Sequence, residues 1–86
     1  MLTVGGDHSI ASGSIHGILS HYEDLKVIWV DAHADILDAD KTDYTGYHGS
    51  PLAHLLGVND NSSKFKGFSW LKRRLKRENV VIIGWR

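Results

Sequence analysis

The 86-residue sequence has no cysteine, a single proline and no long apolar run. Without cysteine, neither a disulfide nor a thiolate metal site can form. No segment approaches the roughly 20 apolar residues that a membrane-spanning helix needs. The opening residues, MLTVGGDHS, lack the charged and apolar regions of a secretory signal peptide. We therefore expect a cytoplasmic protein that is not inserted in a membrane.

Neither sign of charge is in excess, because ten lysine and arginine residues balance ten aspartate and glutamate residues. A nucleic-acid-binding protein relies on surplus positive charge, so this balance argues against that class. Eight of the ten basic residues lie between positions 64 and 86. Their densest run, residues 72–77, is more typical of a solvated helix face than of a nucleic-acid contact. The composition therefore favours neither a nucleic acid nor a membrane surface as a partner.

Three apolar runs predict strands. Val27–Val30 and Val80–Ile83 are continuous and rich in β-branched residues, which is typical of parallel strands buried on both faces. Residues 2–4 form a shorter run that leads into two glycines. Strands of this kind, separated by helical segments, indicate an α/β domain with a parallel sheet.

Helices are expected between these strands. Apolar residues recur at helical spacing over residues 15–22. Ser50 and Pro51 are suited to the start of a second helix that Gly57 can end, and Ser69 can cap a third. Three strands and three helices are too few to cover both faces of a sheet, so residues 1–86 are expected to form one partial domain, truncated from a larger one.

Potential metal ligands follow two of the expected strands. His8 comes after the first, and Asp31, His33 and Asp35 come directly after the second. The carboxyl ends of neighbouring parallel strands meet at one edge of a sheet, and side chains at i, i+2 and i+4 of extended backbone point the same way. Two imidazoles and two carboxylates suit Mn²⁺ or Zn²⁺. The alternative is that these aspartates only cap and solvate the loop.

Four stretches of the chain resemble motifs of the ureohydrolase family. Residues 5–9 read GGDHS and residues 29–35 read WVDAHAD, while GFSW at 67–70 and VIIG at 81–84 are similar to the arginase branch in particular. The resemblance implies an arginase-like three-layer α/β/α sandwich around a parallel sheet. It also implies hydrolysis of L-arginine to L-ornithine and urea by a hydroxide that bridges two Mn²⁺ ions. A homo-oligomer is implied for a full-length form.

The same resemblance assigns roles to individual residues. His8 and Asp35 would bind one manganese, His33 would bind the other, and Asp31 would bridge the two. His33 and Asp35 would also lie against the guanidino substrate. His48 falls where the family has a histidine proposed to move protons, a role that suits the near-neutral pKa of imidazole.

Two departures from the family pattern bear on activity. Leu37 stands where an asparagine is expected, and Tyr44, Thr45 and Gly46 replace a Ser-Gly-Asn run that would hold the substrate carboxylate. The family completes the metal pair with an Asp-x-Asp motif on a later strand, and no such motif stands at a downstream strand end in the 86 residues; Asp38 and Asp40 lie in the loop after the second expected strand. We therefore expect the isolated chain to be inactive. The alternatives are a ureohydrolase acting on another guanidino or amide compound, and a non-catalytic relative.

Overall fold

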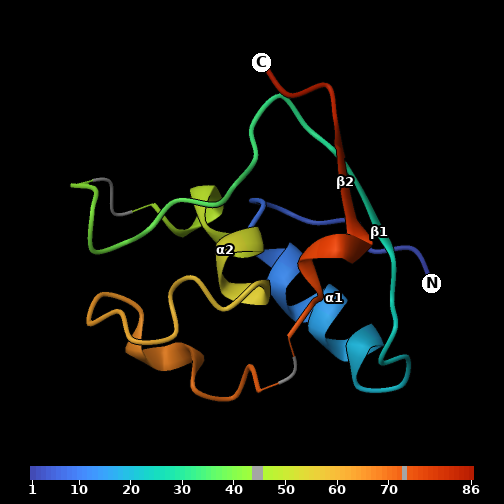
Figure 1. Cartoon of the computed structure of the whole chain (residues 1–86), viewed down its shortest axis with the longest axis horizontal. Coiled ribbons are helices and arrows are strands. Elements are labelled where there is room, and N and C mark those ends of the chain that lie inside the picture. Colours follow the sequence, from blue (N-terminus) through green and yellow to red (C-terminus); the bar gives the residue numbers. More distant parts are fainter. Residues whose placement is uncertain (44–45, 73) are drawn as a thin grey trace.

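The computed structural model describes residues 1–43, 46–72 and 74–86. Among these residues two strands lie side by side, and two helices pack against them (Figure 1). No helix in this described part is long and apolar enough to cross a membrane. The elements are α1 (Ile10–Leu19), β1 (Val27–Val30), η1 (Tyr47–Gly49), α2 (Pro51–Leu55), η2 (Lys66–Phe68), η3 (Arg77–Asn79) and β2 (Val80–Ile83), where η marks a single 3₁₀ turn.

The strands β1 and β2 pair in parallel, which confirms both strands at their predicted bounds. Trp29 is opposite Ile82 in the register. The pairing continues past the strand ends, because the Asp31 amide donates to the Ile83 carbonyl oxygen at 3.0 Å and the Arg86 amide donates to Ala32 at 3.0 Å. The segment that follows β1 is thereby held beside the segment that follows β2.

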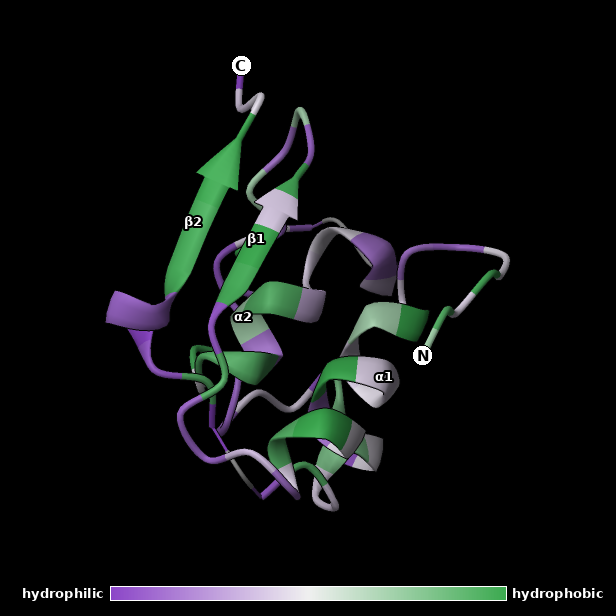
Figure 2. Ribbon diagram, turned by 90° about the vertical axis from the view of Figure 1, so that its right-hand side faces the viewer, coloured by the Kyte–Doolittle hydropathy of each residue, from purple (hydrophilic) through white to green (hydrophobic). Residues whose placement is uncertain are grey.

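The hydrophobic core lies on one face of this two-stranded sheet. Trp29, with 5% of its surface exposed, packs with buried residues of both helices, including Leu19 and Leu52. The helices lie on the same side of the strands (Figure 2). The prediction that both faces are buried is therefore wrong for the described residues. The outward-facing side chains are 50–77% exposed: Ile28, Val30, Val81 and Ile83.

Residues 2–4 do not form the predicted strand. Their backbone belongs to no sheet, and Leu2 and Val4 are 88% and 85% exposed. A short apolar run becomes a strand only where a neighbouring strand supplies hydrogen-bond partners. In the described structure β1 is paired with β2, and residues 2–4 do not pair with it. The two strands that form are those whose side chains reach the core.

The helices differ from the prediction at their ends. Helix α1 begins five residues earlier than the apolar repeat and leaves Tyr22 outside, 68% exposed. Helix α2 starts at Pro51 as predicted and ends before Gly57, whose φ of +80° favours glycine. The predicted cap is different, because the Ser50 hydroxyl makes no cap bond and donates instead to the Leu37 carbonyl at 3.3 Å.

The third predicted helix is also wrong: residues 69–72 and 74–76 are not helical. Leu71 and Leu75 are nevertheless buried, as the pattern indicated. The amide of Leu75 donates to the carbonyl oxygen of Leu55 at the end of α2, at 2.8 Å. Tertiary hydrogen bonding thus replaces the helical bond that this amide would make with Leu71. Arg74 and Lys76 pair with acidic residues of the same chain, Asp60 and Asp24.

Candidate metal centre

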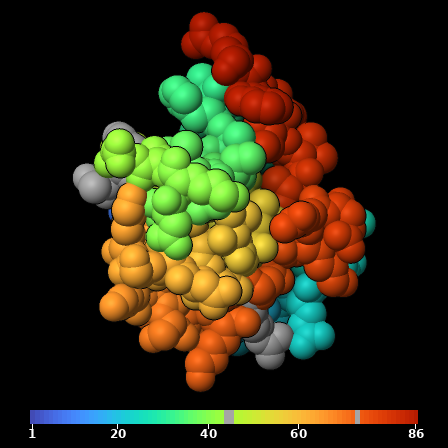
Figure 3. Space-filling view, turned by 60° about the vertical axis from the view of Figure 1, so that its left-hand side comes forward, coloured from blue at the N-terminus to red at the C-terminus, as the bar shows by residue number. Residues whose placement is uncertain are grey.

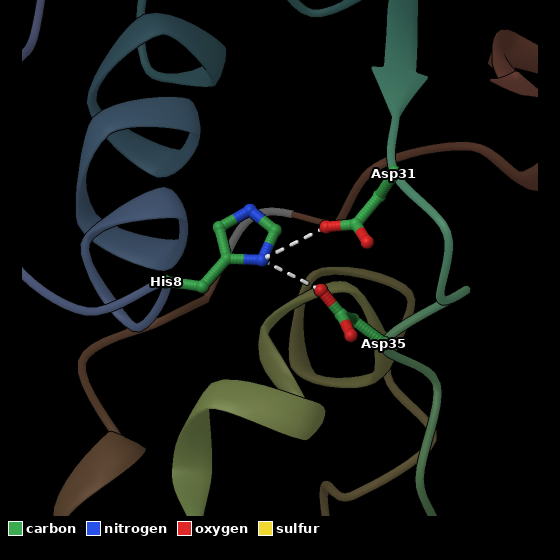
Figure 4. Close-up of side chains that lie close together, drawn as sticks. All are labelled: His8, Asp31 and Asp35. Carbon is green, nitrogen blue, oxygen red and sulfur yellow. Dashed lines mark ion pairs between the residues drawn. The ribbon is translucent and has the colours of Figure 1, made fainter. Parts of the chain in front are cut away.

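Three side chains from separate parts of the chain converge at the carboxyl end of β1. His8 lies in the turn before α1, Asp31 directly follows β1, and Asp35 lies four residues further on. The His8 Nδ1 atom is 2.7 Å from Asp35 Oδ2 and 3.4 Å from Asp31 Oδ2 (Figure 4). One potential ligand atom from each residue lies within 4.8 Å of the other two. The predicted convergence of these three residues is therefore present.

Local backbone geometry aims these groups at one another. Before α1, the Asp7 carboxylate accepts a hydrogen bond from the Ser9 amide at 2.9 Å, which closes the turn that carries His8. The His8 ring lies against the Trp29 ring, with 4.8 Å between centroids. Asp35 has a φ of +51°, a conformation that costs a non-glycine residue energy. That backbone conformation is held by a hydrogen bond from the Ala53 amide of α2 to the Asp35 carbonyl, at 3.0 Å.

The two carboxyl groups have opposite electrostatic environments. The His33 amide donates to Asp31 Oδ1 at 2.9 Å, and this hydrogen bond lowers the pKa of Asp31. Burial raises the pKa of Asp35, because its side chain is only 8% exposed and its charged form loses hydration. An ionised, half-exposed Asp31 thus faces a buried carboxyl group whose charge requires a nearby cation.

The donor set fits a divalent cation. Two ligands about 2.1 Å from one ion lie roughly 3–4 Å apart. The His8–Asp31 distance of 3.4 Å falls in that range, whereas the His8–Asp35 distance of 2.7 Å is shorter than it. Asp35 Oδ2 is buried, and no hydrogen bond of normal geometry satisfies it despite its closeness to His8. A buried carboxylate oxygen in this position is suited to bind a cation. Two oxygens and one imidazole nitrogen are typical of Mn²⁺ or Zn²⁺ sites.

The structure places the fourth predicted ligand, His33, outside this cluster. Its side chain is 83% exposed, and its Nδ1 atom is 3.5 Å from Asp31 Oδ1. The two oxygens of Asp31 therefore face different histidines, Oδ2 towards His8 and Oδ1 towards His33. Position 33 lies at the surface because the chain turns directly after β1, so the i, i+2, i+4 alternation of a strand does not continue through it.

A pocket of about 410 Å³ opens beside the cluster. His33 and Asp35, the predicted substrate-contacting residues, line it together with His48, the predicted proton-transfer residue. Leu37 lines it as well, so the departure from the family pattern faces this space. Of the other departures, Gly46 precedes η1, while residues 44 and 45 lie outside the described residues.

The sequence reasoning missed Trp85, which completes the wall of this pocket. Trp85 is 67% exposed and lies two residues after β2. Its position is the signal that could have identified it, since residues after the carboxyl end of a parallel strand meet those after its neighbour. With Leu37 it makes part of the pocket apolar.

Fold and site together define a class: part of a parallel α/β protein with a candidate divalent-cation site at the carboxyl ends of its strands. The sequence profile of the Arginase family matches residues 1–86. This chain belongs to the arginase family. Its members are hydrolases and are in general metal-dependent.

Individual relatives agree with this assignment. Arginase from Glaciozyma antarctica (strain PI12) is 45% identical over 86 residues, which cover 99% of this chain and 25% of that protein. The Rattus norvegicus protein named mitochondrial arginase-2 is 48% identical, with 99% and 24% covered. The chain thus spans about a quarter of the length of these curated relatives.

Solved structures confirm the fold class. A cold-adapted arginase from Glaciozyma antarctica superimposes with a TM-score of 0.83 at 44% identity, covering 95% of this chain and 29% of that one. The arginase from Bacillus caldovelox gives a TM-score of 0.72 at 41% identity, with 95% and 27% covered. The two-stranded parallel sheet and its helices are part of an arginase fold.

Proposed function

We propose that this chain forms part of the catalytic site of an arginase-type hydrolase that converts L-arginine and water into L-ornithine and urea. The observation that carries the proposal is the convergence of His8, Asp31 and Asp35, together with the pocket that both Asp35 and His48 line. Membership of the arginase family supports the reaction class.

Mn²⁺ is the proposed cofactor, with two ions per complete site. His8 and Asp35 would hold one ion, His33 would hold the second, and Asp31 would contact both through its two oxygens. The separate orientation of those oxygens, 3.4 Å and 3.5 Å from the two histidines, supports this division. When bound, two such metal ions make a water molecule acidic enough to supply a nucleophile at neutral pH.

The chain's own residues would bind the substrate and move its protons. His48 lines the pocket and is the group proposed to deliver a proton to the departing amine, since imidazole exchanges protons near neutral pH. His33 and Asp35, on the same wall, would lie against the guanidino group. The buried Asp35 carboxylate also offers a guanidinium cation an acceptor of opposite charge.

A second candidate substrate class is favoured by Leu37 and Trp85. Both line the pocket, and neither side chain offers a carboxylate the cationic or paired hydrogen-bond donors that hold it well. A guanidino or amide compound without the α-carboxylate of arginine would suit this wall better. A non-catalytic, binding-only relative is the third candidate, and the absence of cation binding would favour it.

The compartment, the partner and the oligomeric state of the protein are also proposed. We retain the cytoplasm as the proposed compartment, with mitochondria, named for the rat relative, as the alternative. A guanidino compound is the proposed partner, in place of nucleic acid or a membrane, and a homo-oligomer is proposed for the full-length form. Two of the cations in residues 72–77 are already paired within the chain, which supports the proposal against nucleic acid.

Cation binding tests the proposal directly. Isothermal titration of the metal-free chain with Mn²⁺ should show binding that His8→Ala abolishes. His21→Ala is the matched control, because His21 is exposed and is not one of the three clustered residues. Equal Mn²⁺ affinity in the two variants would contradict the proposed site.

Turnover is a separate question. The four proposed ligands cannot fill two manganese shells of about five or six positions each. We therefore propose that these 86 residues alone release no substantial urea from L-arginine. Robust urea release with two tightly bound Mn²⁺ ions per chain would overturn this.

A further inference from the structure

Asn59 is a buried polar residue next to the candidate metal centre. It lies in the turn after α2 and is 5% exposed. Its Nδ2 atom donates to the Leu37 carbonyl at 2.9 Å, and its Oδ1 atom accepts from the Ala39 amide at 2.9 Å. The Asn59 side chain therefore bonds both the carbonyl of Leu37 and the amide of Ala39. Because Ala39 is completely buried, its amide needs such a partner.

The backbone held by Asn59 is the continuation of the metal-site loop. Asp35 is two residues before Leu37, and its carbonyl is bonded to the Ala53 amide of α2. Leu37 is held further by its amide, which donates to the Gly49 carbonyl at 3.3 Å. In Figure 3 the green segment that follows β1 lies directly on the yellow and orange segment that includes α2 and the turn after it. Asn59 thus joins the two segments where the loop leaves the site.

This attachment matters because Asp35 has an unfavourable backbone conformation. A φ of +51° persists only where the surrounding structure fixes the chain on both sides. On the amino side, Asp31 is fixed by the β1–β2 pairing, through its amide bond to Ile83. On the carboxyl side, the paired hydrogen bonds of Asn59 fix the chain two to four residues beyond Asp35.

We propose that Asn59 is a positioning residue for the candidate cation site: it holds residues 37–39 so that the Asp35 carboxylate faces His8 and the Leu37 side chain remains at the pocket wall. The inference rests on the proposed function and adds a residue outside both the cluster and the pocket. Asn59 acts through the backbone, without contact to cation or substrate.

Two leucine substitutions test this role. Asn59→Leu keeps the approximate size of the side chain and removes both hydrogen bonds. Asn61→Leu is the matched control, because it makes the same chemical change two residues along at an exposed position. Each variant is titrated with Co²⁺ alone, followed by visible absorption that reports the ligand geometry of the ion. Asn59→Leu should bind Co²⁺ roughly tenfold more weakly, as for other groups that orient ligands, and Asn61→Leu should match the wild type.

A second readout needs no metal. The Ala53 amide reports on Asp35, because it donates to the Asp35 carbonyl. Its hydrogen-exchange protection in the metal-free chain should fall roughly tenfold in Asn59→Leu relative to amides of the β1–β2 pairing. A purely stabilising role would lower the protection of all these amides together. If the wild type binds no Co²⁺, the proposed function fails, and the Ala53 exchange still decides this inference.

Asn59→Asp covers the case in which the leucine variant does not fold. It keeps the acceptor for the Ala39 amide but turns a carboxylate oxygen towards the Leu37 carbonyl. We expect weaker Co²⁺ binding and lower Ala53 protection here too. Wild-type cation affinity and wild-type Ala53 protection in a folded Asn59 variant would overturn the positioning role.

Discussion

Replacement of Asp35 by asparagine should change how the stability of the metal-free chain depends on pH. Asp35 is buried in the cluster, and burial raises the pKa of its carboxyl group. Asparagine has nearly the same shape and cannot ionise. The substitution therefore removes the cost of burying the charge while leaving the packing almost unchanged.

The sign follows from proton linkage. A carboxyl group whose pKa is raised by folding holds its proton more tightly in the folded state, so its contribution to stability is present at low pH. That contribution is lost as the pH rises from the unfolded pKa, about 3.9, through the raised folded pKa. One proton contributes at most about 1.4 kcal/mol per pH unit. A chain of this length has a total free energy of unfolding of roughly 4–13 kcal/mol. A change of that size with pH is therefore measurable.

Urea denaturation followed by tryptophan fluorescence, in chelator and at several pH values from about 3.5 to 6, measures this effect. The stability of Asp35→Asn relative to the wild type should increase with pH. Asp31→Asn is the control with the opposite sign. Because folding lowers the pKa of Asp31, this residue stabilises the folded chain above its unfolded pKa. The stability of Asp31→Asn relative to the wild type should therefore decrease as the pH rises. A flat or decreasing difference for Asp35→Asn would refute the reasoning.

Two further substitutions test the fold that carries the site. Leu52 is 1% exposed in the core, so Leu52→Ala should lower the free energy of unfolding by about 2–5 kcal/mol. Ile28→Ala, on the exposed sheet face, should lower it much less. Equal losses of stability in chemical denaturation would show that the core lies elsewhere. Gly57 has a φ of +80°, and an added Cβ would lie 3.2 Å from Asp60 Oδ2. Gly57→Ala should therefore lower stability by about 1 kcal/mol, and an unchanged or higher melting temperature would contradict that conformation.

Local sequence predicted the parts of the fold that depend on local preference. Val27–Val30 and Val80–Ile83 are strands at the expected bounds, because their residue types favour extended backbone and the alternate side chains of each run reach the core. Residues 2–4 and 69–76 depend on long-range partners instead. Among the residues that the structure describes, no strand pairs with the first, and in the second the Leu75 amide donates to the Leu55 carbonyl at the end of α2. Neither partner is visible in a local pattern.

The site was predictable to a similar extent. Strand-end position accounts for Asp31, which directly follows β1. His8 reaches Asp31 and Asp35 although residues 2–4 form no strand, because the turn before α1 carries it there. The spacing rule did not apply to His33, since the chain turns after β1 and exposes that ring. Asn59 could not be found from spacing, because its function depends on a turn meeting a loop about twenty residues earlier in the chain.

A crystal structure of the chain grown with Mn²⁺, with anomalous diffraction measured at the manganese edge, tests the central claim most directly. The account predicts an anomalous peak about 2.0–2.4 Å from His8 Nδ1 and from a carboxylate oxygen of both Asp31 and Asp35. A manganese ion bound elsewhere, or a His8 ring turned away from both carboxylates in the loaded crystal, would contradict it.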